Sequence, residues 1–170
     1  DRLSPDAKRL LQCAAVVGKT IPFALLGAVA DLSEEDLRRG LAQLTVGEYL
    51  FESALFPEVE YTFKHALTQS VAYHSLLEER RRGLHARIAD AIVALYPERT
   101  NDHVDELGHH AFHGQQWERA CDYLHRAGVR ALTRSAYHDA AARFEQALTA
   151  IVKLPEDSDQ IRRHLDLLLQ

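Results

Sequence analysis

Residues 59–77 read V-E-Y-T-F-K-H-A-L-T-Q-S-V-A-Y-H-S-L-L, and this stretch decides the fold. Val59, Tyr61 and Phe63 alternate with polar residues, which is the pattern of a half-buried strand. From His65 the apolar spacing lengthens to that of a helix, at Leu67, Val71 and Leu77. We therefore expect His65 in the first helical turn, where free N–H groups and the helix dipole favour an anion. The junction predicts either a phosphate site or a histidine that caps the helix within the core.

Three helices are predicted before this stretch. Ser4 caps the first, which ends at Gly18. Ile21-Pro22 opens a short second helix over residues 23–30, and Ser33 caps the third, whose leucines face inward: Leu37, Leu41 and Leu44. Short strands over residues 49–52 and 59–64 then form a hairpin. Three helices followed by a hairpin are typical of a winged-helix domain.

Gly18-Lys19-Thr20 is not a phosphate loop. The motif needs a glycine where Cys13 stands, and the tripeptide follows a helix rather than a strand. We expect a helix end here instead.

The segment after residue 77 predicts a long helix that Pro97 ends, with one apolar stripe: Leu84, Ile88, Ala91, Ile92 and Leu95. The charged run 78–82 is expected to be solvated or to pair with a neighbouring domain. Residues 98–102 are polar and predict a linker. The first domain is thus expected to span residues 1–97 and the second residues 98–170.

The second domain repeats itself at an offset of twenty residues, so that Gly108 recurs as Gly128 and Trp117 as Tyr137. Small residues at matched positions let helices approach closely, and an aromatic residue that opens a helix can wedge against its predecessor. The pattern predicts tetratricopeptide-like helical hairpins. The expected packing residues are Gly108, Trp117, Ala120, Leu124, Gly128, Tyr137, Ala140, Phe144 and Ala147.

Two further features bear on the second domain. A last helix is expected near residues 157–169, and because repeats bury their faces against neighbours, we expect the chain to be part of a larger protein. His109 and His113 lie four apart on one helix face, a spacing that can hold a metal, but no third ligand stands beside them in the sequence. We expect no metal site and interpret these histidines as packing or solvated residues.

Composition is that of an ordinary soluble protein, with a net charge of −5 and 46% hydrophobic residues. The negative charge argues against strong nonspecific binding to nucleic acid. No apolar run approaches the roughly 18 residues that span a bilayer, so we expect a cytoplasmic location and no membrane. Cys13 and Cys121 stand far apart in apolar contexts and predict buried, reduced thiols. No nucleophile with a matched base and no cofactor fingerprint is recognisable, so the chain itself is expected not to be an enzyme.

Several segments resemble the region that follows the ATPase domain in bacterial STAND-type signalling ATPases. One of them reads Y-T-F-K-H-A-L-T-Q-S-V-A-Y-H-S-L-L-E-E-R-R-R-G-L-H-A-R-I-A, residues 61–89, and the others are 14–29, 49–53, 115–128 and 136–148. The resemblance is strongest over residues 61–88. Many such ATPases carry a class III adenylate/guanylate cyclase domain or a transcription-activator domain. The resemblance implies a regulatory, protein-interaction module without a cofactor of its own, in which the parent protein binds ADP or ATP. Its partners would be the adjacent ATPase domain and a protein or small-molecule inducer on the repeats.

The segment F-K-H-A-L, residues 63–67, also resembles the Met-His-Asp motif of NB-ARC ATPases, whose histidine approaches the ADP β-phosphate. His65 is the matching residue, while Lys64 and Ala66 depart from the motif. The resemblance implies that His65 senses nucleotide supplied by another domain.

Two alternatives stay open. A DNA-binding winged helix would place its third helix in the major groove, but here that helix begins with Glu34, Glu35 and Asp36, which repel phosphate, so DNA is an unfavoured partner. The other alternative is a stand-alone repeat module that binds peptides.

Overall fold

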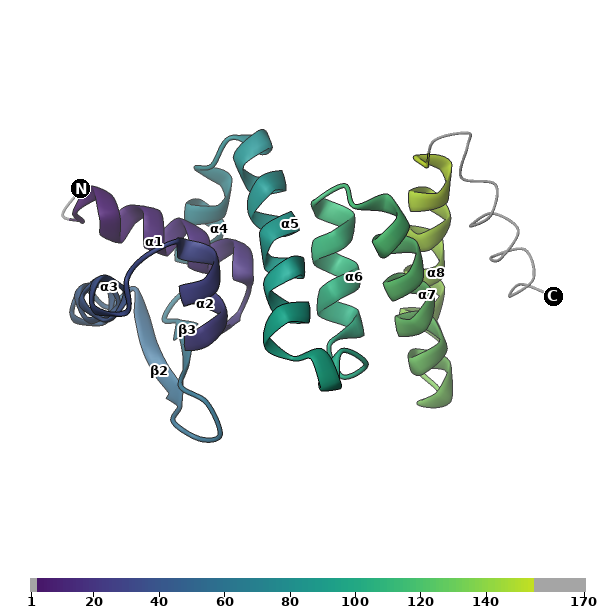
Figure 1. The fold of residues 1–170 in the computed structure, drawn as a ribbon, viewed down its shortest axis with the longest axis horizontal. Coiled ribbons are helices and arrows are strands. Elements are labelled where there is room, and N and C mark those ends of the chain that lie inside the picture. The colour runs from purple at the N-terminus through teal and green to yellow at the C-terminus, as the bar shows by residue number, and fades with distance from the viewer. Residues whose placement is uncertain (1–2, 155–170) are drawn as a thin grey trace. The chain divides into compact units, whose positions relative to one another are not determined.

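The structure, a computed structural model, describes residues 3–154. The chain divides into two compact units, Asp1–Leu95 (unit 1) and Tyr96–Gln170 (unit 2). The described residues are mainly helical and include one small antiparallel sheet, as the sequence predicts (Figure 1). The helix expected near residues 157–169 lies outside the described residues.

Unit 1 has the element order of a winged helix. Its helices and strands are α1 (Pro5–Val17), β1 (Thr20–Pro22), α2 (Phe23–Ala30), α3 (Glu34–Val46), β2 (Leu50–Ala54), β3 (Glu60–Phe63), α4 (Ala66–His74) and α5 (Glu78–Leu95). The strand order in the sheet is β1-β3-β2, so the predicted hairpin forms and its loop extends away from the helices of the unit (Figure 1).

The helix predicted over residues 23–30 is confirmed as α2, with Pro22 as its N-cap residue. The short strand before it, β1, was not predicted: Ile21 pairs with Tyr61 of β3. A strand of three residues is too short to show an alternating pattern. It forms because its partner β3, some forty positions later in the chain, offers an unpaired edge.

The helix starts predicted at Ser4 and Ser33 and the predicted inner faces of the first and third helices are confirmed. The Ser4 side chain accepts a hydrogen bond from Ala7 N at 3.2 Å, and that of Ser33 accepts one from Asp36 N at 3.1 Å. Each serine therefore satisfies a backbone donor that the first turn leaves unpaired. The apolar faces of α1 and α3 are buried, including Leu10, Leu11, Leu37, Leu41 and Leu44.

Removing one of these caps gives a first test. We expect Ser33→Ala to lower the free energy of unfolding of unit 1 by about 1 kcal/mol, because Asp36 N loses its acceptor. Ser33→Thr keeps the hydroxyl and is expected to cost only a few tenths of that amount. Urea titration followed by far-ultraviolet circular dichroism measures both, and equal losses for the two variants would contradict the capping role.

Helix α4 departs from the prediction in the side chains it buries. Leu67 is 74% exposed, Val71 62% and Leu77 81%, whereas the buried residues in this region are Ala72 and Leu76. The apolar spacing therefore predicted the helix correctly, but the residues that show this spacing are not the ones that it buries. The reason is that α4 has nine residues, with little more than two turns to set its face, and α1 contacts its small-residue side.

The described part of unit 2 consists of consecutive helices that pack on their neighbours in the chain: α6 (Val104–His113), α7 (Trp117–Thr133) and α8 (Tyr137–Val152), after a short 3-10 helix η1 (Pro97–Arg99). The buried cluster of α6, α7 and α8 is made mostly of small residues around Leu124, with Phe112, Trp117 and Tyr123 at its margin. Small side chains allow the helix axes to approach closely.

The twenty-residue repeat reappears as a repeated contact. A Cβ atom added at Gly108 would lie 3.0 Å from Leu124 Cδ2, and one added at Gly128 would lie 2.6 Å from Phe144 Cε1. Both pairs join one helix to the next, and the second pair is the first moved along by twenty residues. The two glycines therefore serve the same purpose, which is to make room for a large side chain of the following helix.

The other predicted packing residues divide into two groups. Ala120, Ala140 and Ala147 are buried, and the Trp117 ring packs edge-on against Phe112 with centroids 5.6 Å apart. Tyr137 is 69% exposed, so its expected role as a wedge is wrong for the described residues. It opens α8 as Trp117 opens α7, but no aromatic ring equivalent to Phe112 is present at the end of α7 to receive it.

Candidate functional site

His65 lies between β3 and α4, as predicted, but one position earlier than expected. It is the N-cap residue of α4 with extended backbone angles, not a member of the first turn. Its carbonyl accepts from Thr68 N at 3.0 Å, while its side chain makes no capping hydrogen bond. The imidazole is exposed.

These observations remove one of the two interpretations of His65. A histidine that caps the helix within the core would be buried and would accept a hydrogen bond from the first turn. His65 does neither, so the capping alternative is wrong. An exposed imidazole beside the unpaired N–H groups of α4 stays available to an external ligand.

The charges beside His65 are nearly balanced. Lys64, which follows β3, places its Nζ atom 2.7 Å from Oε1 of Glu48, which precedes β2. The hydrogen bond from Lys64, then its charge, and to a smaller extent the charge of His65 lower the pKa of Glu48. The Lys64 ammonium therefore offsets part of the negative charge that Glu48 places near His65.

Helix α3 is the helix that would enter the major groove in a DNA-binding winged helix. Its two arginines already form ion pairs with acidic residues of the same helix. Arg38 Nη2 lies 2.7 Å from Glu34 Oε1, and Arg39 pairs with Asp36. These are exposed pairs within one helix, and they leave its surface without a net positive stripe. The structure therefore offers no basic recognition surface on α3.

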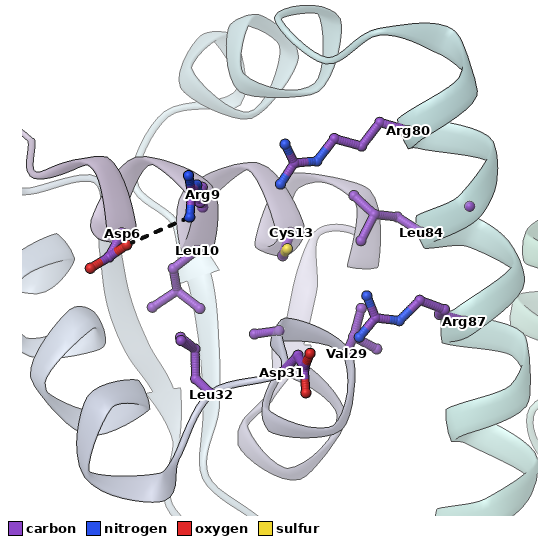
Figure 2. A pocket seen from close by; sticks show the side chains of 12 residues that line it. Asp6, Arg9, Leu10, Cys13, Val29, Asp31, Leu32, Arg80, Leu84 and Arg87 are labelled. Atoms are coloured by element: carbon purple, nitrogen blue, oxygen red, sulfur yellow. Dashed lines mark ion pairs between the residues drawn. The ribbon is translucent and has the colours of Figure 1, made fainter.

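A cleft lies wholly within unit 1, between α1, α2 and α5 (Figure 2). The cleft has a volume of about 460 Å³. Leu10, Val29 and Leu84 supply apolar surface, and three arginines and two aspartates supply charge: Arg9, Arg80, Arg87, Asp6 and Asp31. Figure 2 shows Arg80 and Arg87 reaching from α5 on either side of Leu84.

No cleft was predicted here from the sequence. The charged run 78–82 was expected to be solvated or to pair with a neighbouring domain, and Arg87 had no predicted role. The available signal was the spacing R-x-x-G-L-x-x-R over residues 80–87, which puts two arginines two turns apart on one helix face with a glycine between them. Only the fold shows that α1 and the end of α2 stand opposite that face.

His109 and His113 lie together on α6, with ring centroids 4.5 Å apart. Partial loss of hydration lowers the pKa of His109, helped by the charges of His113 and Arg143, and it also lowers the pKa of His113. Both residues nevertheless keep a large exposed surface. Two imidazoles are fewer than the three or four protein ligands of a zinc site, so this pair alone does not define one.

Both cysteines are free and buried, as predicted. Burial raises the pKa of Cys13, against the opposing charges of Arg80 and Arg87, and raises the pKa of Cys121 to about 11. Thiols held in the protonated form are poor nucleophiles, so neither is suited to covalent catalysis.

Between residues 3 and 154 no helix combines the length and apolar character needed to cross a bilayer. Comparison of the chain with protein-family models, with curated proteins and with solved structures finds no match in any of the three. Support for a function therefore comes from the fold and from the chemistry of its exposed residues.

Proposed function

We propose that the chain is a non-catalytic regulatory and protein-interaction module of a cytoplasmic bacterial signalling ATPase of the STAND type. In this proposal a neighbouring ATPase domain, linked to a cyclase or a transcription-activator domain, holds ADP or ATP. Unit 1 senses the nucleotide, and the helical hairpins of unit 2 bind a protein or small-molecule inducer.

The observation that carries the proposal is the exposed His65 at the strand-helix junction. A side chain at the start of a helix, next to unpaired N–H groups, suits the phosphate of a nucleotide presented by another domain. A protonated imidazole would donate a charge-assisted hydrogen bond to ADP. If ATP-driven rearrangement breaks that bond, the nucleotide biases a two-state switch.

The pairing of charges on α3 favours this proposal over a DNA-binding regulator. Arg38 and Arg39 already neutralise acids of their own helix, so binding to phosphate would have to break both pairs. Duplex affinity that falls steeply with salt would restore the DNA-binding alternative.

Replacing His65 tests the nucleotide role. We expect His65→Ala in the full-length protein to release ADP about tenfold faster, because a hydrogen bond to a charged group contributes roughly 1.5–3 kcal/mol. The activity of the linked cyclase or transcription-activator domain without inducer should rise as a result. The stability of unit 1 should not change, since the side chain is exposed and caps nothing. Stopped-flow release of a fluorescent ADP analogue measures the rate.

The matched control is His74→Ala, at the opposite end of α4. His74 is also exposed, and its Nδ1 atom lies 2.8 Å from Ser70 O, a bond within its own helix. It should leave ADP release unchanged. An unchanged release rate in His65→Ala, with the protein folded, would overturn the nucleotide role of His65.

A further inference from the structure

We propose that the cleft between α1, α2 and α5 binds a small phosphomonoester, with its phosphate between Arg80 and Arg87 and its apolar part on Leu10, Val29 and Leu84. This site lies apart from the surface used in the proposed function, and it stands whether or not His65 senses nucleotide.

Two arginines without partners are the first support. Within residues 3–154 neither Arg80 nor Arg87 makes a hydrogen bond or an ion pair. Arg9, on the opposite wall, lies 3.9 Å from Asp6, so its charge is partly compensated. A guanidinium can donate two parallel hydrogen bonds to two oxygens of a phosphate group. Two guanidiniums can therefore bind all three terminal oxygens of a phosphomonoester.

The geometry of α5 is the second support. Arg80 and Arg87 are seven positions apart, so they share a helix face and lie roughly 10 Å from each other along the axis. Gly83 lies between them on that face, and a Cβ atom added there would meet nothing within 4 Å. The space between the two arginines is therefore open, and their long side chains can close on one group from both sides.

The apolar lining of the cleft is the third support, because it indicates that the ligand has an apolar group besides its phosphate. A volume of about 460 Å³ falls within the range of small-molecule sites, and it exceeds the space that a phosphate ion needs. Leu10, Val29 and Leu84 are buried and form the floor of the cleft, and the half-buried Leu32 adds apolar surface beside them. An apolar substituent on the phosphate would lie on this floor and release water from Leu32.

The negative charge of Asp31 should weaken the binding of an anion in the cleft. Asp31 lines the cleft at the end of α2, and its carboxylate opposes an anion. Its backbone is left-handed, with φ of 56°, a conformation that asparagine also accepts. Asp31→Asn therefore removes the repulsion without straining the turn.

The experiment uses the full chain labelled with nitrogen-15 and three probes: phenyl phosphate, inorganic phosphate and benzoate. We expect phenyl phosphate to shift amide resonances of α1, α2 and α5 and to bind more tightly than the other two. Inorganic phosphate lacks the apolar group, and benzoate carries a single charge on two oxygens. Arg80→Gln and Arg87→Gln should each weaken phenyl phosphate binding about tenfold, whereas Asp31→Asn should tighten it.

The control variant is Arg82→Gln, on the same helix but outside the cleft lining, and it should bind phenyl phosphate like the unmodified chain. Circular dichroism verifies that every variant is folded. The proposal is overturned if phenyl phosphate shifts none of these resonances, if both cleft arginines can be replaced without loss, or if benzoate binds as tightly as phenyl phosphate. A loss of the same size in Arg82→Gln would also overturn it, because it would indicate a response to net charge alone.

Discussion

Leu124→Ala is expected to lower the free energy of unfolding of unit 2 by about 2–5 kcal/mol. Leu124 is fully buried at the centre of the α6–α8 cluster. Several of its neighbours in that cluster are alanines, including Ala111, Ala120 and Ala147. Alanine has no rotamers through which it could fill the space that is left, so a cavity should persist and the loss should lie toward the upper end of the range.

The sole tryptophan of the chain makes this measurement specific to unit 2. Trp117 stands at the start of α7, so urea unfolding followed by its fluorescence reports on this unit. Leu132→Ala provides the control, since Leu132 belongs to the same helix and is 45% exposed. It should change stability by no more than about 0.5 kcal/mol. Equal losses for the two variants would show that Leu124 is not the centre of the core.

Gly128→Ala has the second largest expected effect, a loss of about 1–3 kcal/mol from unit 2. The added Cβ atom would lie 2.6, 2.8 and 2.9 Å from three atoms of the Phe144 ring. A rigid ring cannot yield by rotating one terminal group, so α7 and α8 must move apart. This cost outweighs the roughly 1 kcal/mol that alanine gains over glycine inside a helix.

Two other glycine-to-alanine variants test whether the change in stability follows the space available to the added Cβ atom. Gly108→Ala brings its Cβ atom to 3.0 Å from a methyl group of Leu124, which can shift by a few tenths of an ångström, so its loss should be smaller. Gly83→Ala in α5 meets nothing and should stabilise unit 1 by about 0.5–1 kcal/mol. Trp117 fluorescence follows the two unit 2 variants, and amide hydrogen exchange follows Gly83→Ala. Any other order would contradict the close-approach explanation of the repeat.

Local signals in the sequence determined much of the fold. Ser4 and Ser33 were identified as caps because a cap depends on residues three positions away. The faces of α1 and α3 followed from helices long enough to show their period. The equivalence of Gly108 and Gly128 followed from comparing the chain with itself, because a repeat places equivalent residues at a fixed spacing in the sequence.

The position of His65 was predicted to within one residue, but its exposure was not. Whether a residue at the start of a helix faces solvent depends on which side of α4 meets α1, and Leu67 and Val71 suggested the opposite side. Apolar residues on a short helix do not reveal which face will be covered when the covering element is far away in the chain.

For the described residues, the sequence by itself determined the helices, the caps at Ser4 and Ser33, the hairpin and the repeat, because each of these is encoded in neighbouring or periodic residues. Tertiary structure alone decided that Ile21 joins the sheet, that Tyr137 stays outside the repeat interface and that Arg80 and Arg87 face a cleft built by α1 and α2. These outcomes depend on pairings between residues far apart in the chain. Such pairings are fixed by burial and hydrogen bonding in the folded protein and leave no local pattern.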